Sequence, residues 1–456
     1  MRLRRGVGDV RECKVEKEES VRKTGRTVSR KDFLRLGGGG LAAAALLGTA
    51  GCGGSSRDGE VIRMFVGQAE TAALEREAQG LVDRFEEQNP KYTVEREAIP
   101  PDDVRQVIQT RLRSEQPPDY FSYDTGPGFG GVLADSGLLY SLEKAYEQNG
   151  WDIYDWAKQR ATYGGTTYGV PDQVEELVVY YNTDLVSEEP KTVDDLRAMA
   201  DDLKGQGKTP FGFGDSEQWP AGHLFSIGVS NLLGREGLDN ILYGDERWDT
   251  PEVEEAINLF FRDFVESGYY PDGVNAITYD DANTLFYAGK AAMNITGTWL
   301  VSEIVETVQD FEVGFFPFPS IDGSGISPPA GVGTGTFIAK EAKNPEGGIA
   351  LIDYYQQDDT ARIIMETFNT IPAHPVDTKG LDVPPLFKQV LDDLSKSTEA
   401  GAFGYNIDVL TPANFNEVMF SGFQEVLAGT RSPGEQAAAL QDAWATAKKQ
   451  GKIATQ

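Results

Sequence analysis

Cysteine and histidine are almost absent from this chain of 456 residues, which contains two of each. Cys13 lies in a charged leader and Cys52 follows an apolar stretch, so the body of the protein can form no disulfide framework. The only histidines are His223 and His374. A structural zinc site or another metal centre built on histidine is therefore not expected, and we predict no metal and no cofactor.

Positive charge is also scarce. The chain has 42 Lys and Arg against 72 Asp and Glu, a formal net charge of −30. Such an excess of negative charge argues against a nucleic-acid partner and against a polybasic membrane-binding patch. Apolar residues make up 40% of the chain, which is typical of a globular protein. The length allows two domains with well-buried cores.

The most apolar stretch near the N-terminus is too short to span a bilayer. Residues 1–35 are rich in Arg and Lys, and residues 36–47 are apolar or Gly. A basic region, a short apolar region and small residues before Cys52 indicate a secretory signal over 1–51. Thr49 to Cys52 resembles a bacterial lipobox. We expect an exported protein anchored to the outer face of the cytoplasmic membrane by lipid on Cys52, with 52–58 as a linker.

Strand and helix patterns alternate after the linker. Short apolar runs at 61–66, 92–99 and 120–123 predict strands, and helical spacing of apolar residues separates them. This alternation implies parallel strands with ligands beyond their carboxyl ends. The rule nominates two loops as ligand contacts, and their candidate residues are Gln68, Glu70, Tyr123 and Asp124.

The stretch 163–182 is where we expect the chain to cross from one lobe to another. Gly169 and Pro171 suit a bend, and a β-rich run follows. A second glycine-rich stretch, with Gly331 and Gly333, suggests the return crossing. The resulting division is 59–172 and 332–399 for the first lobe, and 173–331 and 400–456 for the second.

Polar signals mark elements of the second lobe. Thr192 followed by Asp195 predicts a capping box at the start of a helix. Trp219 follows a short strand pattern and is expected in a polar loop. Trp299 follows a Gly-Thr turn, which also favours a loop position.

Five segments carry a resemblance. They are Pro118-Asp119 with its aromatic strand, 168–182, the segment Phe286 to Trp299, Val313 to Pro317, and the run after Gly331. Their order behind a lipobox resembles the extracellular solute-binding proteins of bacterial ABC importers, specifically the maltose-binding-protein-like sugar binders. The resemblance covers nearly all of the chain after the leader.

The resemblance implies an α/β protein with the two-lobed periplasmic-binding-protein-like fold (type II). Each lobe would be a sheet flanked by helices, and the lobes would close on a sugar in the cleft between them. A membrane permease would receive the loaded form, and we expect a monomer that is not an enzyme. The resemblance implies Trp299 for stacking on the sugar, Tyr123 and Glu175 for further contacts, and Asn414 and Phe415 from a late segment. From their own positions in the sequence, Trp219 is a second stacking candidate and Asp124 a second carboxylate candidate.

Other ligands remain open at this point. The same fold could bind a polyamine, a ferric ion or a glycerol-phosphate-like compound, and an exported glycoside hydrolase is a further alternative. A phosphate ligand would favour Arg or Lys in the cleft, and the nominated loops contain neither. Tyr180 and Tyr181 suggest tyrosinate metal ligands, but neighbouring strand residues point to opposite faces.

Overall fold

The structure is a computed structural model that describes residues 60–69, 71–323, 328–399 and 404–453. The predicted signal over 1–51, Cys52 and the linker lie outside the described residues, as does Glu70. Within the described ranges, no helix has both the length and the apolar character of a membrane span.

The first sheet has five strands in the order β2-β1-β3-β12-β6. Three are the predicted ones: β1 (Glu60–Gly67), β2 (Tyr92–Ile99) and β3 (Tyr120–Asp124), and they pair in parallel. The last two, β12 (Thr334–Phe337) and β6 (Gly169–Pro171), are antiparallel to their neighbours. The prediction of a parallel sheet therefore holds for the first three strands.

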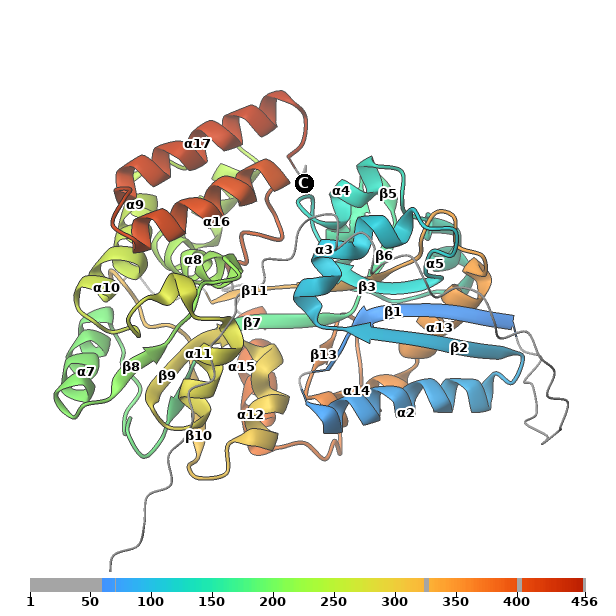
Figure 1. Ribbon diagram of the computed structural model, residues 1–456, viewed down its shortest axis with the longest axis horizontal. Coiled ribbons are helices and arrows are strands. Elements are labelled where there is room, and N and C mark those ends of the chain that lie inside the picture. The colour runs from blue at the N-terminus through green and yellow to red at the C-terminus, as the bar shows by residue number, and fades with distance from the viewer. Residues whose placement is uncertain (1–59, 70, 324–327, 400–403, 454–456) are drawn as a thin grey trace, which may run out of the picture. The chain divides into compact units, whose positions relative to one another are not determined.

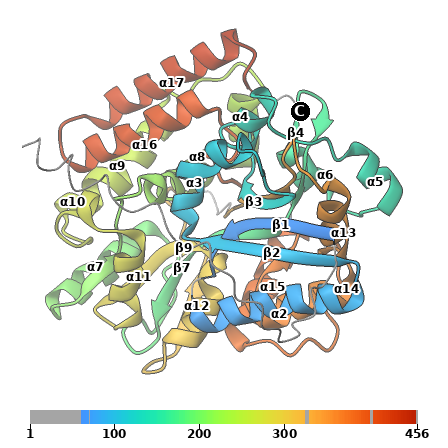
Figure 2. The same cartoon turned by 45° about the vertical axis from the view of Figure 1, so that its right-hand side comes forward.

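Helices cover both faces of this sheet because its strands bury side chains on both. Ile62 and Met64 belong to the core under α2 (Ala72–Gln88) and α13 (Pro345–Tyr355), whereas Phe65 packs with Val104 of α3 (Pro101–Leu112). Figures 1 and 2 both show α2 and α14 on one side of β1 and β2 and α3 on the other. The remaining elements of the lobe are α4 (Gly130–Asp135), α5 (Glu143–Asn149), α6 (Asp155–Lys158), η1 (Gln159–Ala161), the hairpin β4 (Thr162–Tyr163) with β5 (Thr166–Thr167), and α14 (Asp358–Phe368).

The second sheet is built around one long strand, β7 (Gln173–Asn182). Its main path runs β14-β11-β7-β9-β8, and β10 and β13 also pair with β7. The partners are β8 (Thr209–Gly212), β9 (Ala291–Gly297), β10 (Val313–Phe316), β11 (Pro329–Gly331), β13 (Ile371–Pro372) and β14 (Gly404–Tyr405). Alternate residues of β7 enter two cores: Leu177 and Val179 enter one, and Val178 and Tyr180 enter the other.

Two predictions for the second lobe concern the starts of helices, and one of them is confirmed. The capping box of Thr192 and Asp195 is present and opens α7 (Val193–Gly205). Trp219 is the first residue of α8 (Trp219–Leu242), so the expectation of a loop position was wrong. The others are α9 (Pro251–Asn258), η2 (Leu259–Asp263), α10 (Phe264–Glu266), η3 (Val274–Ala276), α11 (Tyr279–Tyr287), η4 (Thr298–Leu300), α12 (Val301–Thr307), α15 (Pro385–Glu399), α16 (Ala413–Leu427) and α17 (Pro433–Lys449).

Within the described residues, the chain crosses between the two sheets three times. It leaves β6 for β7 at Asp172, and it passes from β11 to β12 through residues 332–333, as the glycine patterns indicated. The third crossing follows α14, where β13 pairs with β7. Beyond it α15 packs against α12 and β10. By these contacts α15 lies with the second sheet, whereas the sequence-based division placed 332–399 in the first lobe.

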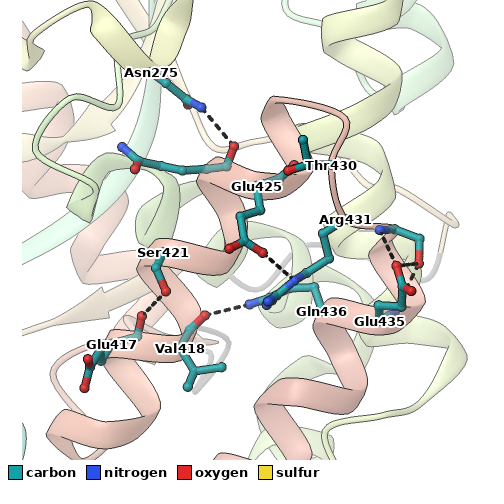
Figure 3. Close-up of polar contacts among 11 residues, drawn as sticks. Asn275, Glu417, Val418, Ser421, Glu425, Thr430, Arg431, Glu435 and Gln436 are labelled. Atoms are coloured by element: carbon teal, nitrogen blue, oxygen red, sulfur yellow. Dashed lines mark hydrogen bonds and ion pairs between the residues drawn. The ribbon is translucent and has the colours of Figure 1, made fainter.

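Polar contacts fix the hairpin of α16 and α17, which covers the second lobe (Figure 3). Arg431 in the connection pairs with Glu425, with 2.7 Å between Nε and Oε2. The buried Gln436 donates to the carbonyl of Val418 at 3.0 Å, and Asn275 of η3 donates to the carbonyl of Gln424 at 2.9 Å. These contacts join α16 to α17 and to η3.

Candidate functional site

A cavity of about 420 Å³ opens at the carboxyl ends of β1 and β3. We call it the cleft. The first lobe contributes Gln68 from the loop after β1, and Tyr123 and Asp124 from the end of β3. The second lobe contributes Trp299 and Ser302 from the segment after β9. Four of the predicted site residues, Gln68, Tyr123, Asp124 and Trp299, therefore line one cavity, although they come from three distant parts of the sequence.

Trp299 is held in place by its neighbours. Its indole Nε1 donates to the hydroxyl of Tyr279 at 2.9 Å, and its ring lies 5.2 Å from that of His223. The ring also folds back over Gly297, where a Cβ atom would lie 1.7 Å from Cζ3 of the indole. The Gly-Thr-Trp sequence therefore has a steric reason, because any side chain at 297 would displace the indole.

Substitution of Gly297 by alanine is expected to lower the free energy of unfolding by about 1–3 kcal/mol, because the new methyl group overlaps a fixed ring. Denaturant unfolding measures this loss, and the NMR signal of the Trp299 indole N–H reports the displaced ring. Gly205→Ala is the matched control, since no atom lies within 4 Å of a Cβ at that helical position. An unmoved indole signal in the Gly297 variant would show that the indole does not need this glycine.

Trp219 lies close to Trp299 but does not line the cleft. Its ring is 4.4 Å from Tyr279 and 5.0 Å from His223. These two rings also contact Trp299, so Trp219, His223, Tyr279 and Trp299 form one aromatic cluster at the wall of the second lobe. Burial, followed by the charge of Arg105, lowers the pKa of His223 to about 3. The imidazole is therefore neutral, and the wall presents uncharged rings.

Two arginines of the first lobe line the cleft, and both are paired. Arg105 of α3 donates two hydrogen bonds to Asp124, each 2.8 Å long. Arg96 of β2 pairs with Glu75 of α2. The two loops predicted to contact the ligand do lack Arg and Lys. The prediction overlooked these two arginines because they come from a helix and a strand. Since each guanidinium has a carboxylate partner, the cleft offers no surplus positive charge here.

Carboxyl groups gather where β6 passes into β7. Asp172 accepts hydrogen bonds from Thr336 at 2.7 Å and Ser122 at 3.2 Å, and burial raises its pKa to about 6. Burial also raises the pKa of Glu175 to about 7, despite a hydrogen bond from Gln173. A carboxyl group with a pKa in this range is partly protonated near neutral pH. It can then donate as well as accept a hydrogen bond, which suits hydroxyl ligands.

The lobes touch each other at several places. Arg105 of the first lobe lies 5.9 Å from the ring centroid of Trp219, and Thr71 at the start of α2 donates to Glu306 of α12. The loop after β3 packs on residues 409–413, and a Cβ on Gly126 would lie 2.0 Å from the carbonyl oxygen of Val409. The two lobes are therefore in direct contact in this structure.

Besides Trp219, three predicted residues do not line the cleft. Glu175 lies beside it, in a small pocket that Gln173 and Trp299 also line. Asn414 donates to the carbonyl of Ala443 at 3.0 Å and lines a different cavity. Phe415 has no exposed surface and packs on Trp248, with ring centroids 5.0 Å apart. The prediction that Asn414 and Phe415 contact the ligand of the cleft is corrected accordingly: Asn414 lines another cavity and Phe415 is a core residue.

Sequence reasoning missed several residues at the site. Arg105 gave no signal because it follows Val104 on an amphipathic helix, where a charge is normally solvated. Asp172, His223 and Tyr279 were likewise not singled out. The position of Asp172 directly after Pro171 at the crossing was the one available clue. Among the described residues, no group of three or more His, Cys, Asp or Glu could hold a metal ion.

Comparison with known proteins identifies the family to which this sequence is similar. The family model described as bacterial extracellular solute-binding protein matches residues 69–362. The chain is 28% identical to the maltodextrin-binding protein of Bacillus subtilis over 267 residues, which is 55% of this chain and 60% of that protein. It is 25% identical to the multiple sugar-binding protein of Streptococcus mutans over 318 residues, 66% of this chain and 72% of that protein. It spans 59% of a Pyrococcus horikoshii relative and 62% of the maltotriose-binding protein of Pyrococcus abyssi.

Solved structures share the fold. A chitin oligosaccharide binding protein superposes with a TM-score of 0.74 at 22% identity, covering 86% of this chain and 100% of that one. The maltose/maltodextrin-binding domain from Bdellovibrio bacteriovorus, bound to maltotriose, gives 0.67 at 18% identity and covers 86% of this chain and 100% of that one. These similarities confirm the predicted type II fold of two lobes.

Proposed function

Because the chain belongs to the bacterial extracellular solute-binding protein family, we propose that it captures a neutral sugar or oligosaccharide between its lobes. The observation that carries the proposal is the cleft, where Trp299 of one lobe faces Tyr123 and Asp124 of the other. A sugar needs flat apolar surfaces for its C–H faces and planar polar groups for its hydroxyls. A ligand that touches both lobes favours the closed form.

The charges of the cleft support a neutral ligand over the alternatives. Arg105 and Arg96 are each paired with a carboxylate, which leaves little for a phosphate group to gain. The raised pKa values of Asp172 and Glu175 favour hydroxyl partners over a polyamine or a ferric ion. Relatives named as maltodextrin-binding and multiple sugar-binding proteins point the same way. The family is one of solute-binding proteins, so we propose no bond-breaking step.

Delivery and location complete the proposal. We propose that the permease of an ABC importer receives the sugar from the closed form, and that the protein acts as an exported monomer. Lipid on Cys52 would hold it at the outer face of the cytoplasmic membrane. The lipobox-like sequence before Cys52 supports the anchor.

A thermal-shift screen tests the ligand class. Neutral mono- and oligosaccharides, spermidine, ferric ion and glycerol 3-phosphate are each added to the purified protein. A sugar at 100 times its Kd should raise the melting temperature by about 3 °C, because it binds only the folded state. At the same sugar concentration the shift should fall to about 1 °C or less in Trp299→Ala. It should persist in Trp151→Ala, a matched truncation of a tryptophan that does not line the cleft. A shift with spermidine, iron or glycerol 3-phosphate alone would keep the fold and reject the sugar.

A further inference from the structure

A second cavity of about 820 Å³ lies on the other side of the loop after β3. It shares no lining residue with the cleft: Asp124 lines the cleft, whereas Gly126 and Pro127 line the second cavity. Its walls come from both lobes. Trp156, Arg160 and Tyr163 belong to the first lobe, and Arg235, Tyr243 and Tyr405 belong to the second.

Positive charge dominates this wall, although the whole chain carries −30. The charged residues that line it are three basic ones, Arg160, Arg235 and Lys452, and one acidic one, Asp135. Arg235 and Arg160 both pack on one ring, with their guanidinium carbons 5.0 and 5.9 Å from the centroid of Tyr405. Within the described residues, no carboxylate lies within ion-pair distance of Arg160. The hydroxyl of Tyr405 donates to Asp239 at 2.7 Å, so one carboxylate lies at the hydroxyl end of this ring. A guanidinium with no carboxylate at ion-pair distance, as at Arg160, attracts an anion.

The second cavity extends towards β11, the strand that precedes the second crossing between the lobes. A smaller space of about 90 Å³ shares Trp156, Arg160, Arg235 and Tyr405 with it and extends to Ala330 and Gly331 of β11. An anion that contacts both arginines would therefore touch both lobes beside a crossing. Because Arg160 and Arg235 belong to different lobes, the distance between them changes when the lobes move. The affinity for such an anion then depends on the arrangement of the lobes.

We propose that the second cavity is an oxyanion site, suited to phosphate or a phosphate ester, and that its occupancy favours the closed form. The guanidinium forks supply the planar donors that phosphate accepts. Coupling is reciprocal, so phosphate should raise sugar affinity by the same factor by which sugar raises phosphate affinity. The anion-binding part of this proposal does not depend on the identity of the ligand in the cleft, whereas the coupling part rests on the proposed sugar binding.

Calorimetric titration of inorganic phosphate into the purified protein tests the site, with ionic strength held constant by sodium chloride. We expect saturable binding that weakens about tenfold or more for each arginine removed in Arg160→Gln and Arg235→Gln, and further in the double variant. Arg247→Gln/Arg262→Gln is the matched control, because it removes the same charge from two exposed ion pairs. Melting temperatures measured in sodium chloride establish whether each variant folds. If the double variant does not fold, the single variant Arg160→Gln is enough to test the site.

The outcomes separate the two proposals. Absence of saturable phosphate binding to the wild type, or equal weakening in the control variant, overturns the oxyanion site. Phosphate binding that depends on Arg160 but leaves sugar affinity unchanged overturns the coupling alone. Phosphate binding without any sugar binding keeps this site and rejects the proposed function of the cleft. Replacing phosphate by glucose 6-phosphate then tells whether the site accepts a phosphate ester or the free anion.

Discussion

Replacement of Gly126 by alanine is expected to lower the affinity for sugar at least about 100-fold while the protein remains folded. The added Cβ would lie 2.0 Å from the carbonyl oxygen of Val409, which belongs to the opposite lobe. Because this contact joins the two lobes, we expect the clash to push them apart and to favour an open form. A ligand that cannot contact both lobes loses the interactions that one lobe supplies. Calorimetric titration with the sugar measures the loss.

The control for this substitution is Gly137→Ala. Both glycines have positive φ, +86° at Gly126 and +67° at Gly137, so alanine strains the backbone at either position. No atom lies within 4 Å of a Cβ at Gly137. The control should therefore lose some stability and keep its sugar affinity. Equal sugar affinities in the two variants would mean that the contact between Gly126 and Val409 is not part of closure.

Glu176→Gln is expected to change how stability depends on pH. The side chain of Glu176 is 1% exposed, and neither of its carboxyl oxygens has a hydrogen-bond partner in the described structure. Burial, with a smaller contribution from the charge of Asp393, raises its pKa to about 8. The folded protein thus keeps a proton that the unfolded chain has already released. As the pH rises from about 5 to 8, the unfolded state is increasingly favoured, so the free energy of unfolding falls.

Glutamine mimics the protonated form and removes this dependence. Relative to the wild type, the variant should gain on the order of 3 kcal/mol in the free energy of unfolding between pH 5 and pH 8. Urea unfolding at several pH values measures the difference. Glu87→Gln, an exposed glutamate of α2, serves as control and should shift stability by less than about 0.5 kcal/mol at any pH. Parallel curves for wild type and Glu176→Gln would refute a buried neutral carboxyl.

The sequence was sufficient for features set by local pattern. Trp299 could be nominated because a Gly-Thr turn precedes it, and Gly297 does lie under its ring. Tyr123, Asp124 and Gln68 followed from one rule, that ligands lie beyond the carboxyl ends of parallel strands, and the cleft contains all three. The first two crossings were visible because glycine and proline disturb a strand pattern.

Features that depend on long-range packing could not be predicted from the sequence. Arg105 enters the cleft because α3 crosses above β3, and no local pattern distinguishes it from a solvated charge. Phe415 was misassigned because an aromatic at the start of a helix fits a core as well as a ligand wall, and Trp248, far along the chain, decides between them. The third crossing is a strand of two residues, Ile371–Pro372, which is too short to give a periodic signal.

The central claim is that a neutral sugar is held between Trp299 and the residues at the end of β3. The most direct measurement is calorimetric titration of the sugar that gives the largest thermal shift, into the wild type and into Trp299→Ala. The account predicts saturable binding with a negative heat-capacity change in the wild type, and an affinity at least about 30-fold lower in the variant. Equal affinity in the two proteins, or no binding of any neutral sugar, would contradict it.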